Sequence, residues 1–336
     1  MTLKKDKRVL VLFHKSLVPP ESVDESHENF EYEPWITEYN VLRALKELKV
    51  SYKGLGVYSD LGVIKDTIDD YKPHIIFNLL EEFDGEVLFD QNVVSFLELL
   101  RQKYTGCNPR GLMISRDKSL AKKLLAYHRI PTPKFQNFLK SKSTKLSKKL
   151  RFPLIVKCLF QEASLGISNA SVVNNEEKLY ERVAYLIDKY DSEVIVEEFI
   201  EGREFYVGVI GNKRLDVLPV WELKFEKVEN PGKELYSENA KWNKKYRERK
   251  GISSSKAILD GELEKKIAHI CKKTYKALEL SGYARIDLRV TKENEVYVLE
   301  ANPNPNIAKA DEFALSAQAK GMKYKEMISK IIQVGL

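Results

Sequence analysis

Two runs that alternate apolar and polar residues, Ala284–Val290 and Val296–Pro305, constrain the fold of this chain more than any other feature. The polar segment Lys292–Glu295 separates them. Alternation of this kind predicts β-strands, and a short polar connection between two such strands predicts a β-hairpin. Because residues two apart on a strand share a face, the register of this hairpin decides which polar side chains meet.

A turn centred on residues 293–294 brings polar groups together on one face of the hairpin. Asp287 then lies across from Glu300. Arg285 lies across from Asn302. Opposed carboxylates repel, so we expect a positive charge between them. Two carboxylates and an amide oxygen suit Mg²⁺, which takes few protein ligands and shares phosphate oxygens. The alternative, a solvated polar face, seldom places acid opposite acid.

Length and composition indicate a globular protein of about two or three domains. The chain has 336 residues, 43% of them hydrophobic, and a net charge of +7. That charge fits an enzyme with anionic substrates or a protein that contacts nucleic acid. The 3 cysteines show no CxxC spacing, which predicts free thiols in a reducing compartment. No segment has the length of a signal peptide or a membrane span, so we predict a cytoplasmic protein.

The first hundred residues alternate strand-like and helix-like segments around a long polar loop at Lys15–Glu33. The predicted elements are strands at Arg8–His14, Tyr52–Tyr58 and His74–Leu80 and helices at Pro34–Leu48 and Val87–Leu100. This alternation predicts an open parallel sheet. Ligands bind such sheets beyond the carboxyl ends of the strands, here after His14 and after Leu80.

The remaining sequence indicates two α+β blocks. Ser115 is predicted to cap a helix that runs to about His128 and ends before Ile130–Pro133. The other predicted elements are strands at Phe152–Cys158, Ser171–Val173 and Glu193–Ile200, a helix at Glu176–Tyr190, the hairpin in a block that starts near Glu201, and helices at Asp311–Lys320 and Tyr324–Ile332.

Several separated segments together resemble one known family. They are Phe77–Leu80, Tyr104–Gly106, Arg116–Lys118, Ile130–Pro133, Phe152–Lys157, Val196–Glu204, Arg285–Asp287 and Leu299–Asn302. In this order they resemble the D-alanine–D-alanine ligase family of ATP-grasp enzymes, from about Pro73 onward. The resemblance implies an α/β and α+β chain with the ATP-grasp fold. A Rossmann-like N-terminal domain, residues 1–108, would precede two α+β lobes, residues 109–200 and 201–336, that clamp ATP.

The resemblance also implies an ATP- and Mg²⁺-dependent ligase that activates a carboxylate as an acyl phosphate, which an amine then attacks. Asp287, Glu300 and Asn302 match the family's Mg²⁺ ligands, with Mn²⁺ as an alternative ion. Lys118 and Lys157 match its two phosphate-binding lysines. A solvated surface charge is the alternative for either lysine alone. Lys157 departs from that alternative because it follows apolar residues in a predicted strand, where an unpaired charge is rare.

The remaining ATP contacts that the resemblance implies lie in two segments, a phosphate-covering loop and the hinge between the lobes. They are Ser164 and Gly166 in the loop, Glu197, Glu198 and Ile200 at the hinge, and Glu204, which matches the acid that takes the ribose hydroxyls. Taken alone, the loop could be an ordinary strand connection, and the acids could be exposed carboxylates at strand ends.

Two residues match catalytic groups of the family. Lys241 matches a lysine on a mobile loop that closes over the γ-phosphate, and Trp242 beside it could help to exclude water. Arg285 matches the arginine that stabilises the oxyanion formed as the amine attacks. The alternative for Lys241 is simple membership of the basic run Lys241–Lys250.

The sequence departs from the family where the family binds its amino acids. Phe13–Ser16 replaces a glycine pair and the serine after it, and Glu81–Glu82 replaces a His-Gly pair. Three acids in the following loop could hold the donor's ammonium, namely Glu21, Glu25 and Glu28. Asp311–Glu312 replaces a serine-leucine pair that receives the acceptor's carboxylate. Acids there would attract an amine or a cation, unless Asp311 simply caps the following helix.

The leading hypothesis is therefore a carboxylate–amine ligase with D-alanyl-D-alanine as its default product. The runner-up is a ligase of the same family that joins a different amino acid, peptide or amine. A nucleic-acid-binding protein and an ATP-binding protein without catalysis are weaker alternatives, the former resting on the basic runs Leu139–Arg151 and Lys241–Lys250. We predict no membrane association. Family members are often homodimers, although nothing in this sequence marks an interface.

Overall fold

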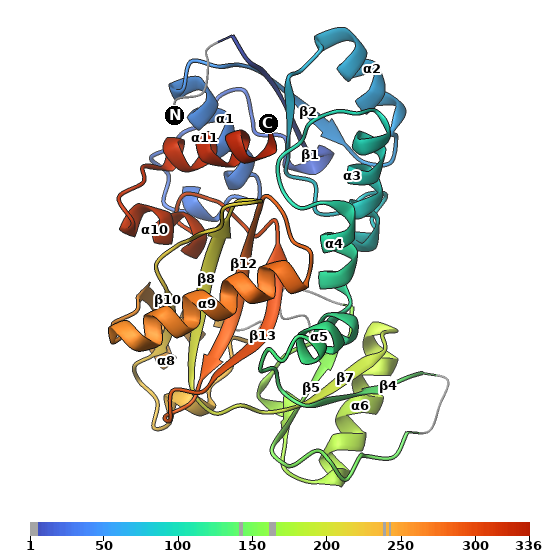
Figure 1. Cartoon of the computed structure of the whole chain (residues 1–336), viewed down its shortest axis with the longest axis vertical. Coiled ribbons are helices and arrows are strands. Elements are labelled where there is room, and N and C mark those ends of the chain that lie inside the picture. The colour runs from blue at the N-terminus through green and yellow to red at the C-terminus, as the bar shows by residue number, and fades with distance from the viewer. Residues whose placement is uncertain (1–5, 141–143, 161–165, 238–239, 242) are drawn as a thin grey trace.

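The computed structural model describes residues 6–140, 144–160, 166–237, 240–241 and 243–336, which form three sheets with their helices. Figure 1 shows the first sheet at one end of the molecule, the largest sheet in the middle and a smaller unit at the other end. Among the described residues, no helix is long and apolar enough to cross a membrane. The predicted order, a parallel sheet followed by two α+β units, is confirmed.

The first unit is a parallel sheet in the order β2-β1-β3, as predicted. Its elements are β1 Arg8–His14, α1 Ile36–Glu47, β2 Ser51–Val57, α2 Gly62–Tyr71, β3 Ile75–Asn78 and α3 Asp90–Leu99, with short 3₁₀ helices η1 Lys15–Leu17, η2 Phe30–Tyr32 and η3 Val87–Phe89. Strand β1 is apolar and buried between its neighbours, as expected for a strand covered on both faces. Helix α2 was missing from the sequence prediction.

The second unit is an antiparallel sheet in the order β4-β7-β5-β6, packed against one helix. Its elements are β4 Phe135–Phe138, β5 Leu154–Cys158, η4 Asn169–Ser171, β6 Val172–Val173, α6 Glu176–Tyr190 and β7 Val194–Glu198. Helix α6 has the predicted bounds, and its apolar face covers the sheet. The sequence prediction omitted β4, the edge strand of this sheet.

The helix predicted to start at Ser115 is wrong. Ser115 lies inside α4, Pro109–Arg116, and a second helix, α5, spans Lys118–Tyr127. Asn108 caps α4 by accepting a hydrogen bond from the Gly111 N–H, and Pro109 occupies the first helical position. Asp117 lies between the two helices in an extended conformation and caps α5. Serine, asparagine and aspartate are all good N-caps, so only the surroundings select Asn108 and Asp117 over Ser115.

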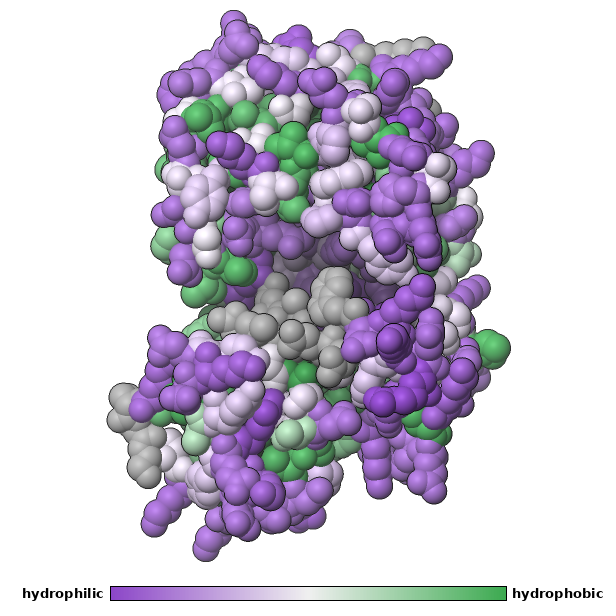
Figure 2. All heavy atoms as spheres, turned by 180° about the vertical axis from the view of Figure 1, so that it is seen from behind, coloured by the Kyte–Doolittle hydropathy of each residue, from purple (hydrophilic) through white to green (hydrophobic). Residues whose placement is uncertain are grey.

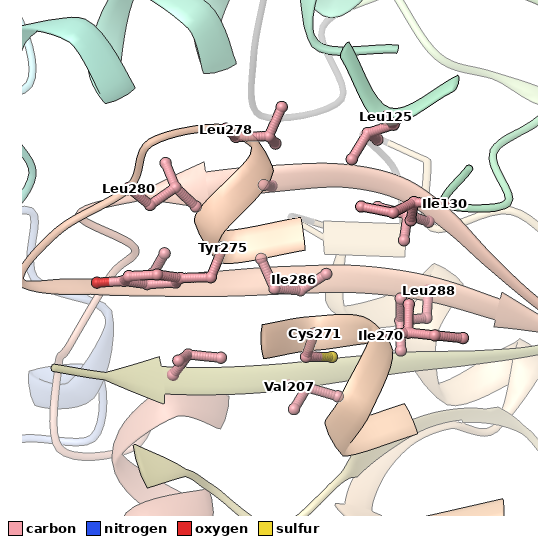
Figure 3. Packing of buried hydrophobic residues seen from close by; sticks show 14 of the residues in the cluster. Leu125, Ile130, Val207, Ile270, Cys271, Tyr275, Leu278, Leu280, Ile286 and Leu288 are labelled. Carbon is pink, nitrogen blue, oxygen red and sulfur yellow. The ribbon is translucent and has the colours of Figure 1, made fainter. Parts of the chain in front are cut away.

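The third unit is the largest sheet, in which the strands lie in the order β11-β10-β8-β12-β13 and β9 pairs with β8. Its elements are β8 Arg203–Ile210, β9 Asp216–Val217, β10 Trp221–Phe225, η5 Pro231–Lys233, α8 Lys244–Lys250, β11 Ile252–Lys256, α9 Gly261–Ala277, β12 Tyr283–Val290, β13 Val296–Pro303, α10 Glu312–Ala319 and α11 Tyr324–Gly335. Figure 3 shows α9 side chains such as Cys271 and Tyr275 packed on Val207 of β8 and Ile286 of β12. The opposite face of β12 is thereby free to carry polar groups.

The last helix returns to the first sheet. Helix α11 packs against α1, and its apolar residues share one core with β1 and β3. Figure 1 shows α11 beside α1 at the same end of the molecule. The end of the chain therefore packs into the core of the N-terminal sheet.

Candidate functional site

The predicted site lies in a cavity between the second and third sheets. Its described lining comes from β5, β7, β8, β12 and β13 and from the start of α5, and its volume is about 120 Å³. Figure 2 shows a hollow across the middle of the molecule, seen from behind. Apolar residues of each sheet point to their own core, so the polar residues that alternate with them line the cavity.

The hairpin register places the predicted metal ligands together. Asp287 pairs with Glu300 across β12 and β13, and Arg285 pairs with Asn302. Arg285 donates two hydrogen bonds to the Asp287 carboxylate, at 2.8 and 2.9 Å. The Asn302 amide lies 3.0 Å from Asp287 Oδ2 and 3.4 Å from Glu300 Oε1. The three oxygen-bearing groups therefore form one compact cluster.

Four cationic residues that the sequence analysis selected converge on Glu300. Burial opposes ionisation of this carboxyl group, but the positive charges of Lys118, Lys157, Lys241 and Arg285 lower its pKa to about 2. Lys157 also pairs with Glu197, and Arg285 pairs with Asp287. Cations that gather around buried carboxylates in a cavity suit a polyanion, such as a phosphate chain together with its metal ion.

The donor set fits a hard divalent ion. Burial raises the pKa of Asp287 to about 6, although Arg285 favours its ionised form. Because burial makes the ionised carboxylate unfavourable, a cation bound beside it would stabilise that form. The Asn302 amide would present its oxygen, in place of the nitrogen, to such an ion. Within the described residues there is no cluster of three or more His, Cys, Asp or Glu side chains, as expected for a site with two acids and an amide.

Glu197 is buried between two lysines. Its side chain is 1% exposed and lies 3.2 Å from Lys157 Nζ and 3.4 Å from Lys122 Nζ. Burial opposes the carboxylate charge, but the two ammonium groups lower its pKa. The exposed-carboxylate alternative is therefore wrong for Glu197. Its charge fixes Lys157 in the cavity, which explains how a lysine is tolerated in an apolar strand.

Sequence reasoning missed Lys122. Its side chain is 2% exposed, and its ammonium donates to Thr132 Oγ1 at 3.1 Å and to the Leu299 carbonyl at 3.0 Å. The signal was available, because Lys122 follows Lys118 by one helical turn and thus shares its face.

Glu204 is held by Arg289, a second residue that the sequence analysis missed. The Arg289 guanidinium donates to Glu204 Oε2 at 2.8 and 3.2 Å, to the Ile200 and Gly232 carbonyls at 3.1 Å each, and to the Glu234 carbonyl. Arg285, Asp287 and Arg289 are two apart on β12, so the strand pattern could have predicted that Arg289 shares the face of the other two. It ties the hinge segment to the third sheet.

The other predicted ATP contacts have separate surroundings. Glu198, next to Glu197 on β7, accepts from the Arg151 backbone N–H at 3.2 Å and also lines the cavity. Gly166 has a φ of +71°, and a Cβ there would lie 2.9 Å from the Tyr190 ring. Ser164 and Trp242 lie outside the described residues.

Lys241 reaches the cavity across an aromatic ring. Its Nζ lies 5.4 Å from the centre of the Tyr236 ring, and burial lowers its pKa against the attraction of Glu300. The structure thus brings both predicted catalytic residues, Lys241 and Arg285, to the carboxylates. Within the basic run that follows, Tyr246 packs on a buried cluster and lies under Arg249 at 5.2 Å, which leaves its ring poorly placed to stack on a base.

The predicted acceptor region carries two interacting acids. Asp311 occupies the N-cap position of α10 but makes no side-chain hydrogen bond to the helix, so it does not act as a cap. Burial raises its pKa to about 8, with Glu312 adding to the effect. Burial also opposes the charge of Glu312, but the hydrogen bond from Asp311 and the charge of Arg285 lower its pKa. The two carboxyl groups therefore do not ionise independently, and burial favours the neutral form of Asp311.

The predicted donor region forms a second cavity of about 340 Å³. It lies at the carboxyl ends of β1 and β3, as the parallel-sheet argument predicted. Glu81 and Glu82 line it, together with Glu38 of α1, which the sequence analysis did not select. The three loop acids considered for the donor, Glu21, Glu25 and Glu28, are exposed and do not line it.

Comparisons with known proteins agree with this geometry. The family model described as "D-ala D-ala ligase C-terminus" matches residues 124–333. The D-alanine–D-alanine ligase of Aquifex aeolicus is 32% identical over 295 residues, which cover 87% of this chain and 92% of that protein. The uncharacterized protein y4sG of Sinorhizobium fredii is 31% identical over 260 residues, which cover 77% of this chain and 74% of that protein.

A solved structure extends the likeness to the whole chain. The crystal structure of D-alanine–D-alanine ligase from Bacillus anthracis complexed with ATP aligns with a TM-score of 0.73 at 24% identity. The alignment covers 98% of this chain and 97% of that one. The fold predicted from the sequence is thereby confirmed.

Proposed function

Because this chain belongs to the D-alanine–D-alanine ligase family of ATP-grasp enzymes, we propose that it uses ATP to join a carboxylate to an amine. The observation that carries the proposal is the convergence of Lys118, Lys157, Lys241 and Arg285 on Glu300. Phosphoryl transfer needs charge neutralisation and alignment more than covalent help, and this cluster supplies both.

ATP would lie between the second and third sheets. Lys118 and Lys157 would hold its phosphates, Glu198 and Ile200 would lie along the adenine, and Glu204 would take the ribose hydroxyls. Glu197 would act through Lys157, which it holds at 3.2 Å. Gly166 lies at the edge of the segment proposed to cover the phosphates.

Asp287, Glu300 and Asn302 would hold Mg²⁺ or Mn²⁺. A bound ion neutralises charge that develops between the phosphates during transfer. Arg285 and Asn302 keep the Asp287 carboxylate oriented at 2.8–3.0 Å. The Asp287 carboxylate is thus oriented before any ligand binds, and the Asn302 amide would only have to turn its oxygen toward the ion.

The donor carboxylate oxygen would attack the γ-phosphorus and release ADP. The amine of the acceptor would then attack the acyl carbon, and inorganic phosphate would leave as the amide forms, with the amine proton passing to solvent or phosphate. Arg285 would stabilise the oxyanion of that step through its guanidinium. Lys241 would cover the γ-phosphate, because its ammonium already faces Glu300.

The first substrate to test is D-alanine, with D-alanyl-D-alanine as the product, since relatives about as similar as the Aquifex protein carry that name. Incubation with ATP, Mg²⁺ and D-alanine, followed by assay of ADP and dipeptide, tests the proposal directly. No ADP release with any amino acid or amine would refute the ligase activity.

The second candidate is a ligase for a different amino acid, peptide or amine. It is favoured by acids in both substrate regions, Asp311–Glu312 beside Arg285 and Glu81–Glu82 in the second cavity. Turnover with other amino acids, without turnover of D-alanine, would select it.

We further propose the domain limits 1–108, 109–200 and 201–336, with α11 returning to the first domain.

A further inference from the structure

The second cavity is built where a ligand is expected. In the sheet order β2-β1-β3, the chain crosses to one side of β1 and then to the other, so the crevice at the carboxyl ends of β1 and β3 is a switch point. The cavity opens there, and residues 304–307 after β13 close its other side. Its volume of about 340 Å³ lies within the range of small-molecule sites.

Negative charge dominates the lining. Glu38, Glu81 and Glu82 line the cavity, and its described lining includes no lysine or arginine. The single histidine, His14, lies 3.4 Å from Glu82 and so engages that acid. We call this space the acidic cavity. A lining of this composition favours a cationic group over a neutral or anionic one.

Glu38 is the strongest evidence for a missing cation. Its side chain is 3% exposed, and among the described residues nothing forms a hydrogen bond with its Oε2. Burial raises its pKa to about 7, the Glu81 charge adds to that rise, and a backbone N–H in the first turn of α1 opposes it. A buried carboxylate without a cationic partner is unfavourable in the free protein. Such a group is typical of a site that is completed by its ligand.

The acidic cavity and the first cavity lie along the same hairpin. Tyr283 lines the acidic cavity, while Arg285, two residues further along β12, lines the first cavity. The two cavities are therefore neighbours along β12. With the reacting group beside Arg285, an ammonium at the end of an alkyl side chain can extend past Tyr283 into the acidic cavity. An α-ammonium stays next to its own carboxyl group.

We propose that the acidic cavity binds a terminal alkylammonium group of the substrate, with Glu38 as its counter-ion. The inference rests on the proposed ligase function and names its substrate class: an amino acid or amine with an ammonium remote from the reacting group. D-Alanine lacks such a group and would leave Glu38 without a partner.

Matched ligands test the inference on the full-length protein. Lysine and 2-aminoheptanoate have side chains of the same length, and only lysine ends in an ammonium. Both enantiomers of each are titrated calorimetrically, with and without ATP and Mg²⁺. We expect one lysine enantiomer to bind at least about tenfold more tightly than its uncharged counterpart, as for a charged hydrogen bond in a buried site. Equal affinity for lysine and 2-aminoheptanoate would overturn the inference.

Two substitutions locate the effect. Glu38→Gln is expected to abolish the preference for lysine, while Glu28→Gln, an exposed acid in the adjoining loop, is expected to retain it. Retained preference in Glu38→Gln would overturn the role of Glu38. Because the pKa of Glu38 is raised, the folded protein at pH 8 carries an unfavourable charge that Gln lacks. Glu38→Gln should therefore raise the melting temperature at pH 8, whereas a purely structural acid at a helix N-terminus would lower it.

The effect of pH on the melting temperature also depends on the other titratable groups that face Glu38. These are His14 at the end of β1, Glu81 and Glu82 after β3, Tyr283 of β12 and Tyr324 of α11. ADP release is measured on the same samples. Absence of ADP with every ligand would refute the ligase, whereas ADP release without any preference for the charged ligand would refute only the present inference.

Discussion

Replacement of Glu197 by glutamine tests the electrostatic centre of the site. The substitution keeps the shape of the side chain but leaves Lys122 and Lys157, at 3.4 and 3.2 Å, without their shared anion. Each pair corresponds to about 5 kcal/mol of attraction at an effective dielectric constant near 20. Part of that energy is offset because the carboxylate no longer has to be buried, and the net cost of breaking such a buried pair is about 3–5 kcal/mol. We expect Glu197→Gln to lower the free energy of unfolding by this amount.

Urea unfolding at pH 8, followed by tryptophan fluorescence, measures the loss. Glu198→Gln is the matched control, because Glu198 is the next residue on β7. Within the described residues its ion pair is with Lys134 at 3.8 Å, whose side chain is 65% exposed, and glutamine can still accept the hydrogen bond from the Arg151 N–H. An ion pair of that kind contributes no more than about 1 kcal/mol. ATP affinity should also fall in Glu197→Gln, because Lys157 is no longer held in the cavity.

The pH dependence supplies a second check. The pKa of Glu197 is lowered in the folded protein from an ordinary value of 4.5. Its contribution to stability is therefore complete above about pH 4.5 and is lost as the pH falls through the lower, folded-state value. The difference between wild type and Glu197→Gln should shrink in acid. Equal unfolding free energies for Glu197→Gln and Glu198→Gln at pH 8 would refute the reasoning.

Three further substitutions probe other parts of the site. Asp287→Asn removes a charged ligand from the proposed ion, so turnover measured as ADP release should fall about a hundredfold, and near-normal turnover would contradict the assignment. Gly166→Ala should destabilise the protein more than Gly321→Ala, because both glycines have positive φ but only at Gly166 would a Cβ meet other side chains within 3 Å; equal melting temperatures would argue against this. Arg289→Lys should lower the free energy of unfolding in urea by about 2–5 kcal/mol, because it leaves buried carbonyls unpaired, whereas Arg203→Lys should lower it less, because the Arg203 side chain is 45% exposed although its partner Glu222 is buried.

The sequence was most informative where function depends on neighbours along one strand. Arg285 and Asp287 share one face of β12, and Glu300 and Asn302 share one face of β13, because the residues of each pair are two apart on their strand. The parallel sheet was predictable for a similar reason, because β1 is a continuous apolar run and helices follow at regular intervals. These features require no knowledge of distant contacts.

Long-range partners were beyond the reach of the sequence. Taken alone, Glu197 could have been an exposed acid, because nothing local shows that Lys122, which lies far before it in the sequence, is beside it in the fold. The boundary between α4 and α5 could not be predicted for a similar reason. Asn108, Ser115 and Asp117 are all good caps, and only the tertiary position of the two helices selects among them.

The predicted register is correct at the site, although beside the turn the pairing is symmetric about Glu293 and not about residues 293–294. Beside the turn, Val290 pairs with Val296. Continued without interruption, that ladder would put Leu299 opposite Asp287 and turn Glu300 toward the apolar face of the sheet. The register shifts between Asp287 and the next residue of β12, so Leu299 is an extra residue on β13 and Glu300 faces Asp287 instead.

This bulge links the face that carries Asp287 and Glu300 to the lysine cluster. A bulge residue leaves a backbone group without its ladder partner, and here the Leu299 carbonyl accepts a hydrogen bond from Lys122 Nζ at 3.0 Å. Lys122 in turn pairs with Glu197, which holds Lys157 in the cavity. One extra residue in β13 therefore sets the position of Glu300 and anchors the lysines that surround it. A sequence pattern of strict alternation conceals such a residue, because the alternation is correct on either side of it.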